Sequence, residues 1–179
     1  MAGAWALIWC ATVIVNARLA QSLARDSFAT AASAVAAPGA AVPPNSGTAL
    51  ADLSIPRLNL SAIVFHGSDR HTLSIGVGHV EDTAFPGEPG NVAIAGHRDT
   101  FFRPLRNVQV GDDVFLATPR DRLHYRVSSL SVVGANEISV LLPTENPTLT
   151  LITCYPFWVL GRAPDRFVVR ATRVADSGH

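Results

Sequence analysis

The chain of 179 residues is long enough for one domain of ordinary size with an appended segment. Fourteen basic and 14 acidic residues give it a formal net charge of zero, which argues against a general surface for nucleic acid or another polyanion. Its two cysteines, Cys10 and Cys154, are too few for a disulfide framework, and they do not form the Cys-x-x-Cys pair of many metal and redox sites.

The N-terminus, MAGAWALIWCATVIVNARLAQ, has no charged residue between Ala2 and Val15. This run is short for a bilayer span, which needs about 20 residues, although Leu19 extends its apolar character beyond Asn16. The alternatives are a signal peptide or an incomplete start, but a signal peptide normally begins with basic residues and none precedes the apolar run. We therefore interpret residues 1–23 as a single membrane anchor helix, whose orientation the flanking charges leave open.

Residues 24–51 have the composition of a linker. The stretch TAASAVAAPGAAVPPNSGTA is dominated by alanine, which buries little surface, and its Pro-Pro pair favours extended backbone. We expect this segment to connect the membrane to a folded domain at residues 52–175, which is followed by a tail at residues 176–179.

From residue 52 onward the chain consists of short β-prone runs separated by turn residues. Within one of them Leu123, Tyr125 and Val127 alternate with polar residues, which is the period-2 pattern of a half-buried strand. The helical candidates are short: DRHTLSIG, TFFRPLR and EISVLL. The domain is therefore predicted to be mainly β, a barrel or a sandwich rather than a βαβ fold. The β-prone runs are LSIPRL, SAIVF, NVAIAGH, DVFLAT, LHYRVSSLSVV, TLTLITC and RFVVRATRV.

Cys154 ends the strand-forming run TLTLITC and is followed by a Tyr-Pro pair. Counting by twos along a strand places Cys154 on one face with threonines, and Leu149 and Leu151 on the opposite, more apolar face. A lone cysteine is most often a buried packing residue. A position at the end of a strand, on the less apolar face and before a proline, instead favours a nucleophile held by a rigid element.

A cysteine nucleophile needs a general base, and six histidines are available. His79 and His97 stand out because each of them follows a glycine. His97 also follows a strongly apolar strand, so it is an end-of-strand residue like Cys154, and we expect both at one rim of the fold. Position alone therefore favours His97 over His79.

A tetrahedral adduct on a cysteine also needs a donor for its oxyanion, and arginine suits this role because it stays charged. Arg162 lies in the loop LGRAPD, whereas Arg166 opens the run RFVVRATRV. Since most arginines are solvated surface groups, the residues by themselves do not decide between these two.

The segments around these residues resemble the sortase family. TLITC, residues 150–154, matches the signature Thr-Leu-x-Thr-Cys, and AGHRDTFFRPL is similar to the histidine segment of sortases. The stretches GVGH, PGEPGNVAIAGH and TCYPF…GRAPDRFVVRA resemble the forms in class D sortases. The resemblance covers the chain from about Leu53 to Arg173 and keeps the family's order of histidine, cysteine and arginine.

This resemblance implies a fold and a set of site residues. The fold is a sortase-type eight-stranded β-barrel with short helices, preceded by the N-terminal membrane anchor and the linker. Cys154 corresponds to the family's nucleophile, His97 to its general acid/base, and Arg166 to the arginine that opens the last strand. Thr153, the threonine before the cysteine, is implied as a substrate contact.

The implied activity is that of a membrane-anchored cysteine transpeptidase. Such an enzyme cleaves an LPXTG-like sorting signal near the C-terminus of an exported protein through a thioacyl-enzyme. It then transfers that protein to an amine of a peptidoglycan precursor or to a pilin lysine. The implied location is the cytoplasmic membrane, with a single pass and an extracytoplasmic catalytic domain. No cofactor or nucleic acid is expected, and Glu137 and Glu145 are too few carboxylates to predict the calcium site of some sortases.

Two other functions stay open from the residues. An L,D-transpeptidase is also an envelope cysteine acyl-transferase, but its compact His-Gly-Cys-x-Arg arrangement is absent, because a Tyr-Pro-Phe segment follows Cys154. A non-enzymatic envelope β-module would hold Cys154 in its core, and labelling of the thiol in the folded protein would distinguish that case.

Overall fold

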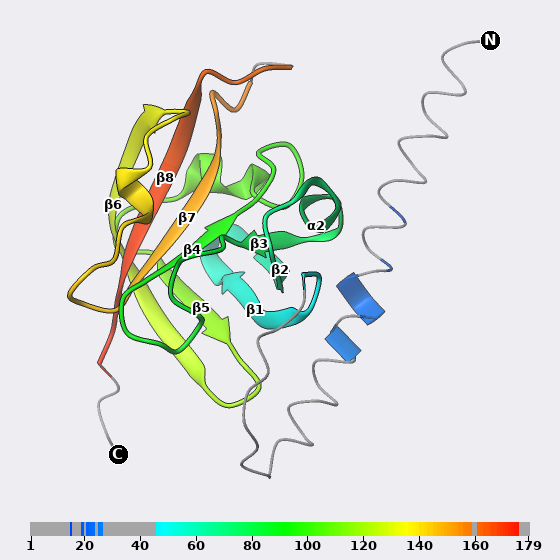
Figure 1. The fold of residues 1–179 in the computed structure, drawn as a ribbon, viewed down its shortest axis with the longest axis vertical. Coiled ribbons are helices and arrows are strands. Elements are labelled where there is room, and N and C mark those ends of the chain that lie inside the picture. Colours follow the sequence, from blue (N-terminus) through cyan, green and yellow to red (C-terminus); the bar gives the residue numbers. More distant parts are fainter. Residues whose placement is uncertain are drawn as a thin grey trace.

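The folded part of the chain is a closed β-barrel (Figure 1). A computed structural model describes residues 15, 19, 21–23, 25–26, 46–158 and 161–175. The strands close in the order β1-β2-β3-β4-β7-β8-β6-β5, which confirms the predicted mainly β class and the eight strands implied by the resemblance. They are β1 (Ala49–Ile55), β2 (Leu60–His66), β3 (Val77–His79), β4 (Asn91–Ala95), β5 (Asp113–Ala117), β6 (Arg122–Gly134), β7 (Thr148–Tyr155) and β8 (Asp165–Arg173).

The helices between the strands are short. The three helical segments expected from the sequence coincide with α2 (Arg70–Ile75), η2 (Arg103–Asn107) and η3 (Ser139–Leu141), while η1 (Pro56–Leu58) lies inside a run predicted as strand. Asp69 caps α2, because its carboxylate accepts hydrogen bonds from the Thr72 hydroxyl at 2.6 Å and from two backbone N–H groups of the first turn. These bonds, that from the hydroxyl foremost, lower the pKa of Asp69 to about 2.

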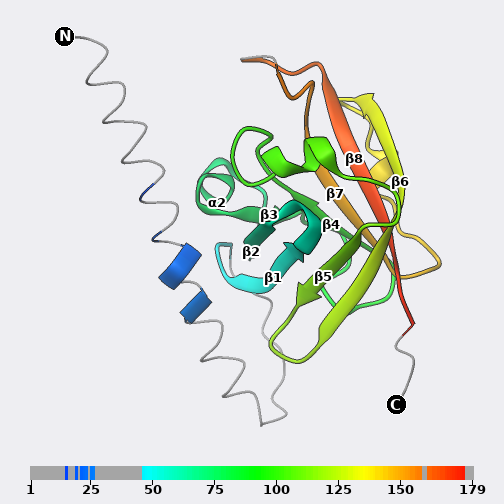
Figure 2. The same ribbon diagram turned by 180° about the vertical axis from the view of Figure 1, so that it is seen from behind.

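The apolar core fills the inside of the barrel, where alternate residues of every strand point. Leu149 and Leu151 of β7 are fully buried in it together with Val169 and Ala171 of β8. This confirms that the leucines of β7 face inward, so that Cys154 lies on the outer face of the strand. Figure 2 shows the barrel from behind, with the β5–β6 hairpin extending at one side.

The structure differs from the sequence prediction in one strand and one boundary. β3 was not predicted as a strand, because it has three residues and its central Gly78 carries no side chain to give a pattern. A Cβ atom at Gly78 would collide with the backbone carbonyl of Gly67, so the close approach of these segments requires glycine. The predicted linker ends too late, because β1 already begins at Ala49 and pairs with β2.

The described residues between 15 and 26 are helical, and two of them, Gln21 and Arg25, form hydrogen bonds with the barrel. Gln21 is 7% exposed, donates to the carbonyl of Ile75 at 2.6 Å and accepts from the backbone of Ile63 at 2.7 Å. Arg25 donates to the Ser61 hydroxyl at 2.8 Å. No helix in the described part of the chain is long and apolar enough to cross a membrane. Most of the predicted anchor, Cys10 included, lies outside the described residues, as does the predicted tail.

Candidate active site

Cys154 and Arg166 lie directly opposite each other on neighbouring antiparallel strands, β7 and β8. Opposed residues leave the sheet on the same face with Cβ atoms about 5 Å apart, so the thiol and the guanidinium stem start side by side. The Cys154 side chain is half-buried and its thiol is free. The Arg166 guanidinium donates to the carbonyls of Ala163 at 3.3 Å and Asp165 at 2.9 Å, which holds it at the start of β8.

His97 follows β4, which pairs in parallel with β7. The last pair of this ladder is Ala95 opposite Ile152, so His97 and Cys154 each lie two residues beyond it. The ladder continues one step further, because the Gly96 N–H donates to the Ile152 carbonyl at 3.1 Å. The side chain of His97 is exposed. The structure therefore brings the predicted base and the predicted nucleophile to the same end of two adjacent strands.

Thr153 has a different environment from the one expected of a substrate contact. Its side chain is 2% exposed on the inner face of β7, and its hydroxyl donates to the Gly96 carbonyl at 2.7 Å. A direct contact with a substrate would require this hydroxyl to leave Gly96. The bond instead connects Thr153 to the backbone immediately before His97.

Two further contacts define the path of the chain after His97. The Phe102 N–H donates to the His97 carbonyl at 3.0 Å, and the Phe102 ring is fully buried. A Cβ atom on Gly96 would lie 2.7 Å from that ring. Glycine is therefore needed at this position because an aromatic ring packs against its backbone.

Arg98 is a positioning residue that the sequence reasoning missed. It is 8% exposed, and its guanidinium donates to the carbonyls of Pro156 at 2.9 Å and Gly161 at 2.8 Å. It thereby ties the segment between β7 and β8 to the residue next to His97. Its place directly after His97 is a sequence signal that could have drawn attention to it. The sequence does not show, however, to which distant carbonyls an arginine donates hydrogen bonds.

Cys154, Arg162 and Arg166 line one pocket of about 580 Å³, together with Ala135 and residues 161–164. Arg162 is exposed, as expected for its loop, but it opens onto the same pocket as the thiol. The geometry thus fixes Arg166 by the strand and by two carbonyls, while Arg162 has no comparable anchor among the described residues.

His79, the other histidine considered as a base, is fully buried. Its Nε2 lies 3.0 Å from the Ala84 carbonyl, and its ring stacks on Phe85 and His66 with centroids 4.9 and 5.6 Å away. Burial, foremost, lowers the pKa of His79. Such a closed environment favours a packing role over proton exchange with a substrate.

The chain matches the Sortase domain family over residues 53–174. The chain belongs to the sortase family. This sortase is 35% identical over 132 residues to Sortase D of Bacillus subtilis, a match that covers 73% of this chain and 67% of the relative. It is 29% identical over 106 residues to Sortase A of Listeria monocytogenes, covering 57% of this chain and 47% of that protein.

The solved structures agree with this assignment. The sortase superimposes on a Clostridium perfringens Sortase D5 transpeptidase with a TM-score of 0.73 at 25% identity, covering 90% of this chain and 99% of that one. The family makes it a transpeptidase, which decides against the L,D-transpeptidase and the non-enzymatic β-module considered above.

The segment between β6 and β7 is held against the barrel by a buried asparagine. The buried side chain of Asn91 donates to the carbonyls of Val140 and Leu142 at 3.0 and 3.1 Å and accepts from the Thr150 hydroxyl at 2.6 Å. It thereby holds η3 against the outer faces of β4 and β7. The sequence analysis did not single out Asn91, although a polar residue that opens the apolar run NVAIA is a usable signal. Among the described residues, no three His, Cys, Asp or Glu side chains are grouped to hold a metal ion.

Proposed function

We propose that this sortase cleaves an LPXTG-like sorting signal near the C-terminus of exported proteins and forms a thioacyl-enzyme on Cys154. The observation that carries the proposal is the position of three side chains. Cys154 lies opposite Arg166 on β8, and His97 and Cys154 each lie two residues beyond the last pair of the parallel β4–β7 ladder. This arrangement supports the assignment of nucleophile, proton carrier and cation to these three residues.

In the first half-reaction the Cys154 thiolate attacks the carbonyl carbon of the threonine in the sorting signal. The negative charge that develops on the carbonyl oxygen is stabilised by the Arg166 guanidinium, which stays charged at any physiological pH. The bond between threonine and glycine then breaks, and protonated His97 gives its proton to the leaving amine. The product is a thioester between Cys154 and the sorted protein.

In the second half-reaction an acceptor amine attacks the thioester. His97, now neutral, takes the proton of the amine, the carbon–sulfur bond breaks, and the thiolate of Cys154 is regenerated. The acceptor is an amine of a peptidoglycan precursor or of a pilin lysine, and water in its place gives hydrolysis. The hydrogen bond from Thr153 to Gly96 supports both steps, because it fixes the backbone before His97.

We further propose that residues 1–23 hold the enzyme on the cytoplasmic membrane with a single pass and the barrel on its outer side. Exported proteins emerge there, so the sorting signal and the catalytic face meet in one compartment. A reporter fused after His179 tests this topology, and a cytoplasmic readout would contradict it.

The test of the activity uses the full-length protein and a peptide library of the form Leu-Pro-Xaa-Thr-Gly. Cleaved peptide and a mass increase on the protein are expected, and the increase should be lost in Cys154→Ala and on treatment with hydroxylamine, which cleaves thioesters. A matched Cys10→Ala variant should keep the activity and the mass increase, which would show that Cys10 does not carry the thioester. Turnover that survives in Cys154→Ala would refute the proposal.

A further inference from the structure

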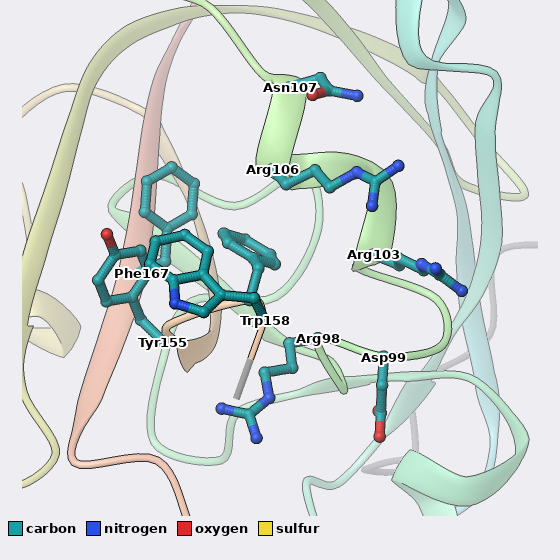
Figure 3. A pocket seen from close by; sticks show the side chains of 9 residues that line it. Arg98, Asp99, Arg103, Arg106, Asn107, Tyr155, Trp158 and Phe167 are labelled. Atoms are coloured by element: carbon teal, nitrogen blue, oxygen red, sulfur yellow. The ribbon is translucent and has the colours of Figure 1, made fainter. Parts of the chain in front are cut away.

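A cleft of about 770 Å³ is lined by residues that follow His97 and Cys154 along the chain (Figure 3). Arg98 and Asp99, the two residues after His97, line it, and so does Tyr155, the residue after Cys154. The thiol itself opens onto the separate pocket that contains Arg166. The end of β4 and β7 that holds His97 and Cys154 is therefore flanked by two separate openings.

The charge in this cleft is mostly positive. Arg103 and Arg106 lie three residues apart on η2, a 3₁₀ helix in which such residues share one face. Both side chains are exposed, and neither guanidinium forms a salt bridge or a side-chain hydrogen bond within the part of the chain that the structure describes. Asp99 is the only carboxylate among the lining residues, and Arg98 already donates to two carbonyls. Two neighbouring cations repel each other when no carboxylate forms a salt bridge with either of them, so an anionic ligand would interact favourably with both.

The base under these arginines is rigid. Arg57 donates to the Asn107 carbonyl at 2.7 Å and to the Asp112 carboxylate, so the C-terminal end of η2 is fixed. Leu105 of η2 is fully buried in the core. The guanidinium groups of Arg103 and Arg106 are therefore presented from a fixed backbone.

The other wall of the cleft is aromatic. The rings of Tyr155, Phe157, Trp158 and Phe167 contact one another, with centroids between 5.4 and 6.2 Å apart in the measured pairs. Trp158 is nevertheless 77% exposed. Such a wall accepts flat or apolar groups, while the η2 side accepts a negative group.

We propose that this cleft binds the amine acceptor and recognises a carboxylate or phosphate group on it through Arg103 and Arg106. This inference rests on the proposed function, because a transpeptidase must admit two substrates. The acceptor amine must attack the thioester carbon on Cys154 while His97 takes its proton, and the cleft is lined by the residues that directly follow these two, Arg98 and Asp99 after His97 and Tyr155 after Cys154. The positive potential also favours the neutral form of the incoming amine, which is the form that attacks.

The test measures aminolysis and hydrolysis of the thioacyl-enzyme by the full-length protein. The acceptors are two matched pairs: triglycine with triglycinamide, and O-phosphoethanolamine with ethanolamine. The members of the first pair differ in a carboxylate and those of the second in a phosphate, so the two pairs together show which anionic group the cleft recognises. The double variant Arg103→Gln with Arg106→Gln is compared with wild type, and Arg120→Gln, an exposed arginine in the β5–β6 turn, is the control for lost charge.

For wild type we expect that, in at least one pair, the KM of the anionic acceptor is about fivefold lower than the KM of its neutral partner. This ratio is typical of the affinity gained from exposed charge-assisted contacts. The double variant should lose this difference, while Arg120→Gln keeps it and the rate of thioacyl-enzyme formation stays the same in all three proteins. If the thioacyl-enzyme forms but the two acceptors of each pair have equal KM values, the inference about the cleft is overturned while the proposed function stands. Slower thioacyl-enzyme formation in the double variant would assign the cleft to the donor and overturn it too. No thioacyl-enzyme in wild type would overturn the proposed function itself.

Discussion

Thr153→Val is the substitution that best separates a positioning role from a substrate contact. Valine has nearly the shape of threonine but lacks the hydroxyl that donates to the Gly96 carbonyl at 2.7 Å. Thr153 is 2% exposed and Gly96 is buried, so water does not replace the lost donor easily. Leaving a buried acceptor without its partner costs about 1–3 kcal/mol of folding free energy.

For a domain of this size, 1 kcal/mol corresponds to about 3–5 °C in Tm, so a cost of about 1–3 kcal/mol lowers Tm by roughly 3–15 °C. The effect on activity should be larger than the effect on folding suggests. Once Gly96 is released, His97 moves relative to Cys154, and a displacement of about 1 Å in a catalytic group can lower the rate by about a hundredfold. We therefore expect kcat to fall by about tenfold or more, with KM for the sorting peptide within about twofold.

The assay is steady-state cleavage of the selected sorting peptide, together with a thermal melt of each protein. Thr153→Ser restores a hydroxyl and should recover most of kcat. Thr150→Val removes a buried hydroxyl that donates to Asn91, so it controls for a general loss of stability. A raised KM with an unchanged kcat in Thr153→Val would refute the positioning argument and return Thr153 to the role of a substrate contact.

Three further predictions follow from the site and the fold. His97→Ala should lose about a hundredfold or more in turnover, as expected for a general acid/base, whereas His79→Gln should mainly lower Tm; the reverse order in folded proteins would contradict the assignment. Arg166→Lys should lose about a hundredfold, since lysine keeps the charge without the planar fork, and Arg162→Ala less than about tenfold; equal losses of peptide turnover would move the cation to the loop. The carboxylate of Asp69 has its pKa lowered to about 2, so its contribution to stability is present above about pH 4 and is lost as the pH falls through 2. Chemical unfolding between pH 5 and 2 should therefore show a weaker acid dependence in Asp69→Asn, and identical pH profiles would show that the cap does not act through its charge.

Much of the barrel could be predicted from the sequence because its strands carry strong local patterns. Seven runs were identified, and the alternation in β7 correctly separated its leucines from Cys154. β3 could not be predicted in this way. Its central residue must be glycine because the backbone of Gly67 lies too close to Gly78 for a Cβ atom, and such a backbone contact produces no alternation of apolar residues in the sequence. Alternating apolar and polar side chains predict which face of a strand points to the core. Close contacts between backbone segments leave no such pattern in the sequence.

The site was predictable only where residues sit at strand ends. Strand position placed His97 and Cys154 together, since β4 and β7 are neighbours in the closed barrel. The partners of Thr153 and Arg98 are carbonyls more than 50 positions away along the chain, so no local pattern reports them. The choice between Arg162 and Arg166 depends on the carbonyls that accept hydrogen bonds from Arg166. These carbonyls belong to the loop before β8, whose backbone conformation is known only from the structure.

The way Arg98 holds the segment between β7 and β8 bears on how this sortase could be re-engineered. Both measured bonds from its guanidinium end on main-chain carbonyls, those of Pro156 and Gly161. Main-chain carbonyls are common to all amino acids, so side chains between these two positions can be exchanged without removing the anchor. The length and course of the segment cannot change as freely, because the two carbonyls must stay within reach of one guanidinium. A library that diversifies this segment at constant length therefore varies the wall of the cleft while leaving the residue beside His97 in place.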